Sequence, residues 1–206
     1  MTLSFHNKHC TSRLTMTCLL TTALFATALP GLAVPTPPSL RPSPELAFTV
    51  PGQGERLLSQ YRGQVVALEF IVTTCPHCQA ASKVMTGLQQ RYGKRGLQAL
   101  AVAIDPDADG RVANFALVNQ VGFPVGWTTL ERMMTYMGFT QRPVVPQLVL
   151  IDRDGNIRYQ TPREGDADSM KEEVIAQRME ELLAQKPSCG RRSRADTKKA
   201  ASLAGR

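Results

Sequence analysis

Residues 65–78 read VVALEFIVTTCPHC, an apolar run followed by two cysteines three positions apart. The run is apolar at both alternating sets of positions, which predicts a strand buried on both faces and therefore central in a sheet. Residues 76–92 then have a proline in the first turn, apolar residues at helical spacing and a glycine just beyond, so they predict a helix. The two thiols thus lie where a buried strand meets a helix start, and they can close into a disulfide and reopen.

The helix start favours a reactive thiolate at Cys75. Unpaired N–H groups and a partial positive charge at a helix N-terminus stabilise a thiolate over a thiol. Such a position can lower a cysteine pKa from about 8.5 to roughly 3.5–7.5. Cys78 lies one turn inside the helix, so we expect it to be more shielded and to react second.

A second buried strand is predicted at 97–104, after the helix at 76–92. A strand, a helix and a second strand in this order form a βαβ unit with parallel strands and a right-handed crossover. On the helix we expect four apolar residues to face the core: Ala80, Val84, Met85 and Leu88.

The remaining predicted elements are shorter. Residues 48–50 and 55–58 are strand candidates, 110–121 a helix, 123–127 a short strand, 131–137 a short helix and 168–185 an amphipathic helix. Residues 144–151 and 157–159 are apolar runs separated by an Asp/Gly turn, a pattern that predicts a hairpin.

The N-terminal region is typical of a targeting segment. Residues 1–33 begin with a mildly basic stretch, continue with an uncharged Thr-, Ala- and Leu-rich run, and end in small residues suited to cleavage after Ala33. The apolar run is shorter than the roughly 20 residues of a membrane span, so a cleaved signal peptide is favoured over a retained anchor. We therefore expect export to the periplasm, or anchoring at the outer face of the inner membrane. Five prolines make residues 34–44 an extended linker.

The basic character of the chain belongs to its ends. The formal net charge is +7, with +6 on residues 186–206 and +3 on 1–44, which leaves −2 on 45–185. A nearly neutral predicted domain at 45–186 argues against nucleic-acid binding, and 187–206 is predicted to be a disordered basic tail. The tail holds Cys189, an odd thiol whose role the sequence leaves open.

The chain resembles the thioredoxin superfamily, and within it the exported TlpA/ResA-like thiol-disulfide oxidoreductases. The resemblance rests on Leu68-Glu69-Phe70 before the Cys-x-x-Cys motif, on Phe123-Pro124-Val125, and on Val145-Pro146 leading into the hairpin. It implies an α/β thioredoxin-like fold, in which a central mixed β-sheet is flanked by helices and carries an N-terminal β extension.

The resemblance also implies roles for particular residues. Cys75 and Cys78 match the attacking and resolving thiols. Pro146 matches the cis-proline, whose loop with Val145 faces the dithiol and binds substrate, although Pro143 competes for this assignment. Glu69, six residues before Cys75, matches the buried acid that exchanges protons with the resolving thiol, and a carboxyl in an apolar strand should have a raised pKa. The alternative is an exposed Glu69 or one paired with an arginine.

Two departures from the family pattern concern substrate contacts and redox potential. Thr74 stands where most relatives have tryptophan before the first cysteine, so the usual wall beside the site is missing. The intervening pair Pro76-His77 is similar to that of the strongly oxidising DsbA. A histidine here can stabilise the Cys75 thiolate, which favours the reduced form and makes the disulfide more oxidising.

The sequence therefore predicts an enzyme that exchanges its dithiol with cysteines of exported proteins, as a reductase rather than an oxidase. A peroxiredoxin-like peroxidase is an alternative, but that family has Thr three residues before its cysteine and position 72 is Val. A copper- or zinc-handling module is another, although His77 and the two cysteines do not complete a four-ligand site. No nucleotide or flavin motif is present, so we expect no cofactor. Reducing power would come from a membrane or periplasmic thiol-disulfide partner protein.

Overall fold

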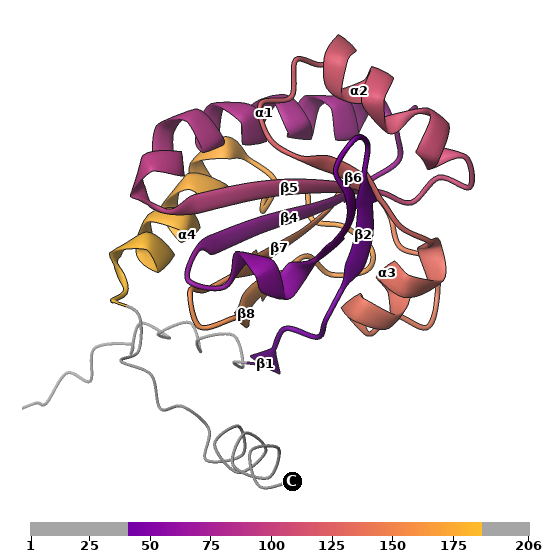
Figure 1. The fold of residues 1–206 in the computed structure, drawn as a ribbon. Helices are drawn as coiled ribbons and strands as arrows, with labels where there is room; N and C mark the ends of the chain where they lie inside the picture. Colours follow the sequence, from indigo (N-terminus) through magenta and orange to yellow (C-terminus); the bar gives the residue numbers. More distant parts are fainter. Residues whose placement is uncertain (1–40, 187–206) are drawn as a thin grey trace, which may run out of the picture. The chain divides into compact units, whose positions relative to one another are not determined.

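The computed structural model describes residues 41–186, which form a β-sheet flanked by helices (Figure 1). In chain order they are β1 Arg41–Pro42, β2 Ala47–Val50, β3 Gly54–Leu57, β4 Val65–Ile71, α1 Pro76–Tyr92, β5 Leu97–Ala103, α2 Val112–Val118, β6 Val125–Trp127, α3 Leu130–Met137, β7 Gln147–Ile151, β8 Asn156–Gln160 and α4 Glu172–Ala184. Short 3-10 turns lie at Leu58–Tyr61, Gly93–Arg95 and Ala108–Gly110.

All eight strands form one mixed sheet in the order β1-β8-β7-β4-β5-β6-β2-β3. β4 lies near its centre, parallel to β5 on one side and antiparallel to β7 on the other. Every residue of β4 is buried, as its apolar run predicts. The predicted α/β fold with a central mixed sheet, flanking helices and an N-terminal β extension is therefore confirmed.

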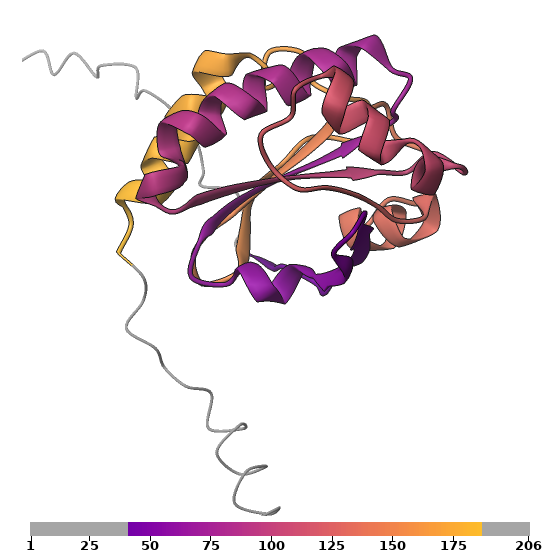
Figure 2. The same cartoon turned by 45° about the horizontal axis from the view of Figure 1, so that its top comes forward.

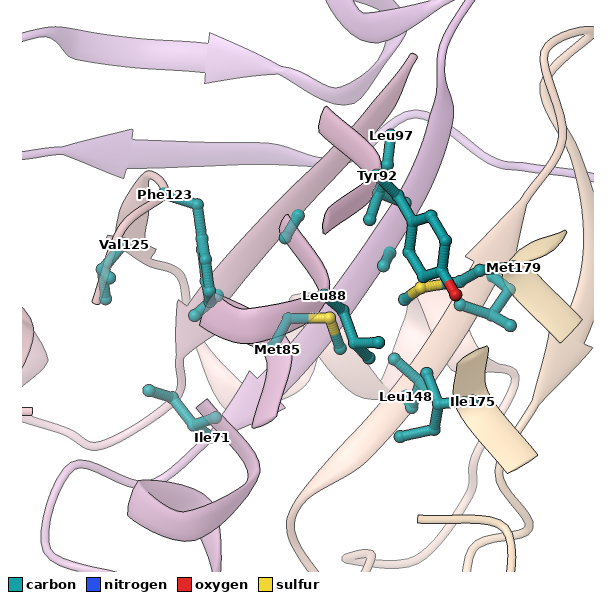
Figure 3. Packing of buried hydrophobic residues seen from close by; sticks show 14 of the residues in the cluster. Ile71, Met85, Leu88, Tyr92, Leu97, Phe123, Val125, Leu148, Ile175 and Met179 are labelled. Atoms are coloured by element: carbon teal, nitrogen blue, oxygen red, sulfur yellow. The ribbon is translucent and has the colours of Figure 1, made fainter. Parts of the chain in front are cut away.

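Helices cover both faces of the sheet (Figure 2). On one face, Met85 and Leu88 of α1 pack with Ile175 and Met179 of α4 and with Leu148 of β7 (Figure 3). On the other face, α3 and β2 pack against the alternate residues of β4 and β5. Because strand side chains alternate between faces, the odd-numbered residues of β4 face α1 and the even-numbered ones face α3. Glu69 is one of the odd-numbered residues, so its side chain lies on the α1 side of the sheet.

The two edge strands are short or charged. β1 contains Pro42 and pairs only with β8, and β3 carries Glu55 and Arg56 and pairs only with β2. The pairing of β1 with β8 extends by one residue, because the N–H of Ser43 donates to the carbonyl of Gly155 at 2.9 Å. The described fold thus begins inside the stretch 34–44 that was predicted to be a linker, before the predicted domain boundary at 45.

Three predicted details are wrong. Ala80 is exposed, because the buried face of α1 is made by Cys78, Ser82, Met85, Leu88 and Tyr92. The first helix after β5 begins at Val112 rather than 110, after a 3-10 turn. The last helix begins at Glu172 rather than 168, since Asp166 accepts hydrogen bonds from the N–H groups of two following residues and forms a turn there.

Within residues 41–186, no helix combines the length and the apolar character that crossing a membrane requires. The predicted signal peptide at 1–33 and basic tail at 187–206 lie outside the described residues.

Candidate functional site

The two motif cysteines lie at the junction of β4 and α1. Cys75 is the N-cap residue of α1 and Pro76 follows as its first residue. The Cys75 N–H donates to the carbonyl of Val72 at 3.0 Å, and the Cys75 carbonyl accepts from the N–H of Gln79 at 3.1 Å. Both cysteines are free thiols; Cys75 is partly exposed, whereas Cys78 has no exposed surface. The expectation that Cys78 is the more shielded thiol is confirmed.

A carboxylate from the neighbouring strand anchors the loop before Cys75. Asp105 lies just after β5, and its two carboxylate oxygens accept from the backbone N–H of Thr73 at 3.1 and 2.9 Å. The Thr73 hydroxyl donates to the same carboxylate at 3.1 Å. Since β4 and β5 are parallel, their carboxyl ends meet at one edge of the sheet, which brings Asp105 to the loop. The position of the reactive thiol is therefore tied to β5.

The surroundings of Cys78 oppose its ionisation. Burial raises the pKa of the Cys78 thiol well above its ordinary value, although its sulfur accepts a weak hydrogen bond from the N–H of Val72 at 3.5 Å. The nearby Cys75 side chain and the Glu69 carboxyl raise this pKa further. Cys78 therefore remains a neutral thiol near neutral pH, and it needs a base if it is to attack a disulfide.

Glu69 is a suitable base. It is completely buried in β4, and its register partners on the adjacent strands, Ala101 and Leu148, are apolar. Burial raises its pKa to about 8, and a hydrogen bond donated by the Ser82 hydroxyl to Oε1 counteracts part of that rise. Oε2 has no hydrogen-bond partner among the described residues. The predicted buried acid is confirmed, and an exposed or arginine-paired Glu69 is excluded.

Ser82 places a hydroxyl beside this carboxyl on the helix that carries Cys78. It lies one turn after Cys78 on the buried face of α1 and has no exposed surface. Cys78, Ser82 and Glu69 thus form a buried polar group inside an otherwise apolar layer between α1 and β4. A pKa near 8 means that the carboxyl changes its charge close to neutral pH, so it can accept and return a proton there.

A groove with a volume of about 470 Å³ lies beside the motif. Three parts of the chain line it: α1 with His77, the loop at residues 144–146, and the segment at 164–170. The residues that line the groove are mostly small or apolar, and its acidic lining residues are Glu164 and Asp166. The groove therefore brings the motif and the proline loop to one surface.

The loop has the backbone form that the resemblance implies. The Val145–Pro146 peptide bond is cis, so Pro146 rather than Pro143 is the cis-proline. Val145 and Pro146 line the groove together with His77, whereas Thr74 and Pro76 are exposed but do not line it. The predicted site residues thus lie in two adjoining places. Thr74, Cys75, Pro76 and Cys78 are at the helix start, with Glu69 on β4 beneath α1. His77, Val145 and Pro146 line the groove.

Sequence reasoning missed Ser82 and Asp105. Ser82 could have been found as a polar residue four positions after Cys78, on the helix face that also carries Met85. Asp105 could have been found as an acid that directly follows a buried strand parallel to β4. The groove walls at 164–170 carry no local signal, because they reach the motif only through the tertiary fold.

Metal-binding geometry is not found among the described residues. Within 41–186, no group of three His, Cys, Asp or Glu side chains is placed so that it could hold a metal ion. The motif itself offers Cys75, His77 and Cys78, but His77 is exposed while Cys78 is buried.

Comparisons with known proteins place the chain among thiol-disulfide enzymes. A sequence profile described as the AhpC/TSA family matches residues 42–160. Thiol-disulfide oxidoreductase ResA of Bacillus thuringiensis subsp. konkukian is 26% identical over 121 residues, which are 58% of this chain and 68% of that protein. ResA of Bacillus anthracis is 31% identical over 108 residues, 51% of this chain and 59% of that protein.

A solved structure extends the likeness to three dimensions. The crystal structure of a Chlorobium tepidum protein, described as thiol:disulfide interchange protein DsbE, matches with a TM-score of 0.60 and 26% sequence identity. The match covers 70% of this chain and 96% of that one. The fold of this chain therefore also occurs in a protein described as a thiol:disulfide interchange protein.

Proposed function

The chain belongs to the AhpC/TSA family and is a thiol-disulfide oxidoreductase with a thioredoxin-like fold, and from this premise we propose that its Cys75/Cys78 pair exchanges disulfides with cysteines of other exported proteins, acting as a reductase. One observation carries the proposal: the partly exposed Cys75 is the N-cap residue of α1, while Cys78 one turn on is buried near the carboxyl of Glu69. The first thiol is placed to meet a substrate and the second to release it.

The first step uses Cys75. Its thiolate attacks one sulfur of a substrate disulfide; a new S–S bond forms to Cys75, and the other substrate sulfur leaves as a thiolate. The substrate segment lies along the groove between α1 and the Val145–Pro146 loop. The result is a mixed disulfide between enzyme and substrate.

The second step uses Cys78. Glu69 accepts the proton of the Cys78 thiol, and the resulting thiolate attacks Cys75 at its sulfur. The bond to the substrate breaks and the second substrate sulfur leaves as a thiolate, so the substrate gains two electrons and the enzyme becomes a Cys75–Cys78 disulfide. A thiol-disulfide partner protein in the membrane or periplasm would then supply two electrons to restore the dithiol.

The direction of exchange depends on the redox potential. His77 lies exposed between the two cysteines, and any positive charge on it stabilises the thiolate and so makes the disulfide more oxidising. The resemblance to the TlpA/ResA-like family favours the reductase direction, while His77 favours oxidation. A potential near about −270 mV for the Cys75/Cys78 couple would support a reductase, and one near about −120 mV an oxidase.

Insulin reduction tests the proposal. The full chain would be prepared with Cys10, Cys18 and Cys189 changed to Ser, so that only the motif thiols react. We expect this protein to accelerate the reduction of insulin by dithiothreitol, the Cys75→Ser variant to be no faster than dithiothreitol alone, and the Cys78→Ser variant to accumulate a mixed disulfide. Equal rates with and without Cys75 would remove it from the mechanism.

The peroxidase alternative has its own test. Hydrogen peroxide would replace insulin as the oxidant of the reduced protein, and its consumption would be measured in the same set of variants. A rate constant for peroxide that exceeds the rate constant for insulin by several orders of magnitude would favour a peroxidase over a disulfide reductase.

A further inference from the structure

Gln147 is a fully buried polar residue directly after the cis-proline. It is the first residue of β7 and has no exposed surface. Its side-chain amide is satisfied in both directions: Nε2 donates to the carbonyls of Val144 at 2.7 Å and Pro162 at 3.1 Å, and Oε1 accepts from the Thr161 hydroxyl at 2.6 Å. The mechanism described above does not use this residue.

These hydrogen bonds fasten two separate segments to each other. Val144 belongs to the loop at 144–146, whereas Thr161 and Pro162 follow β8. The Val144 N–H also donates to the carbonyl of Arg163 at 3.0 Å. Both backbone groups of Val144 are therefore used within the protein, one by the side chain of Gln147 and one by the segment after β8.

The neighbouring Val145 differs from Val144. Neither its N–H nor its carbonyl has a hydrogen-bond partner among the described residues, and it lines the groove. Val144 lines the groove too, and on the facing side a Cβ at Gly165 would lie only 3.4 Å from it. The Gln147 amide thus sets the spacing of the groove wall and leaves the backbone of Val145 free.

We propose that Gln147 is a positioning residue for the substrate: by tying Val144 to Pro162 it holds the groove wall in place and presents Val145 to the peptide that carries the substrate disulfide. This inference rests on the proposed function. A single planar amide donates twice and accepts once, so one side chain can join three partners. Without it the carbonyls of Val144 and Pro162 would lose a donor and the buried Thr161 hydroxyl would lose its acceptor at 2.6 Å. Leaving buried polar groups unpaired is costly, so the loop would rearrange.

The role predicts a difference between substrates. A small disulfide needs only the sulfur of Cys75, whereas a protein disulfide also needs the groove wall. Loss of the Gln147 amide should therefore slow reaction with a protein substrate while leaving reaction with a small one unchanged. A purely structural role would lower both rates together.

The experiment compares two disulfides in single-turnover reactions of the pre-reduced chain, with Cys10, Cys18 and Cys189 changed to Ser. The protein substrate is insulin and the small substrate is 5,5′-dithiobis(2-nitrobenzoate). In Gln147→Met, which is similar in volume but has no amide, we expect the second-order rate constant for insulin to fall about tenfold, the equivalent of one lost hydrogen-bonding group. We expect the rate constant for the small disulfide to stay within about twofold.

A second variant covers the possibility that Gln147→Met does not fold. Thr161→Val removes the hydroxyl that donates to Oε1 and accepts from the N–H of Leu148, at nearly constant volume. It keeps the bond from Gln147 to Val144, so we expect the same selectivity with a smaller, about threefold, loss for insulin. Equal losses for the two substrates, or no loss for insulin in a folded variant, would overturn the role of Gln147. Failure of the parent protein to react with either disulfide would instead overturn the proposed function, and this inference with it.

Discussion

Cys75 and Cys78 lie within one turn of the same helix but in different surroundings. Cys75 is partly exposed at the helix start, near the exposed His77, whereas Cys78 is buried with Glu69 and Ser82. The exposed surroundings of Cys75 suit encounter with a substrate. The buried surroundings of Cys78 suit a proton transfer that solvent does not interrupt. The difference teaches that the roles of two identical side chains are set by burial and by the neighbouring strand, not by their spacing in the sequence.

Replacing Glu69 should have the largest effect on the buried surroundings of Cys78, and it should appear in the pH dependence of the free energy of unfolding. Its pKa is about 8 in the folded protein and 4.5 ordinarily, so the native state binds the proton more tightly than the unfolded state. Its contribution to stability is therefore complete below about pH 4.5 and is lost as the pH rises toward 8. Between about pH 5 and pH 7.5 this loss amounts to about 3 kcal/mol.

Glu69→Gln has no such titration, so we expect the free energy of unfolding to fall with pH in the parent protein by about 3 kcal/mol more than in the variant. Denaturant unfolding of the reduced proteins at the two pH values measures this difference. Other titrating groups are common to both proteins and cancel, and Cys78 titrates above this range because its pKa is raised. Parallel pH dependences would show that Glu69 is not a buried acid with a raised pKa.

Replacing Ser82 should have a smaller effect on the buried surroundings of Cys78, measured as the rate of mixed-disulfide release. Its hydroxyl stabilises the Glu69 carboxylate, so Ser82→Ala raises the pKa of Glu69 further and leaves less ionised base at neutral pH. We expect release of the mixed disulfide to slow about tenfold at pH 7, the value of a hydrogen bond to a charged group, and to recover at higher pH. Acid quenching followed by alkylation of free thiols measures the release rate.

Two further variants sharpen this prediction. Ser82→Thr keeps the hydroxyl and should restore most of the rate. Glu69→Gln removes the base and should slow release about 100-fold with no recovery at higher pH. A Ser82→Ala profile that is lower at every pH by the same factor would mean that Ser82 contributes only to packing.

Replacing His77 tests the exposed surroundings of Cys75 and should have the smallest effect, a shift in redox potential. The role proposed for the His77 imidazole is to stabilise the Cys75 thiolate, and therefore the reduced form. We expect the redox potential of His77→Ala to become more negative by roughly 30 mV, about 1.4 kcal/mol for two electrons, with the pH profile of release unchanged. Equilibration with glutathione measures the potential, and Thr74→Ala, also exposed beside Cys75, is the matched control. A more positive potential in His77→Ala would contradict the role.

The sequence predicted the parts of the fold that local patterns determine. The strand at 65–72, the helix at 76–92 and the strand at 97–104 were found because apolar runs and helix-start residues are encoded within a few positions of each other. Glu69 was identified as a buried acid through the family resemblance and its apolar strand, and the structure was needed to exclude an exposed or arginine-paired side chain.

The features that were missed depend on contacts between distant segments. Asp105 reaches Thr73 only because two strands pair in parallel, and Gln147 reaches Pro162 only because a hairpin folds back. Ala80 was assigned to the core because it is apolar, but the buried face of α1 includes Cys78 and Ser82, and this places Ala80 on the exposed side. Residue type alone could not reveal that the core tolerates polar groups at this point.

The edge strands of the sheet affect how such an enzyme can bind other polypeptide chains. β1 contains a proline, which has no N–H to offer, and β3 presents Glu55 and Arg56 in an exposed strand. Both features discourage a foreign strand from adding to the sheet. A thiol-disulfide oxidoreductase that meets incompletely folded chains, with their own unpaired strands, would thereby bind them through its groove and not through the edges of its sheet.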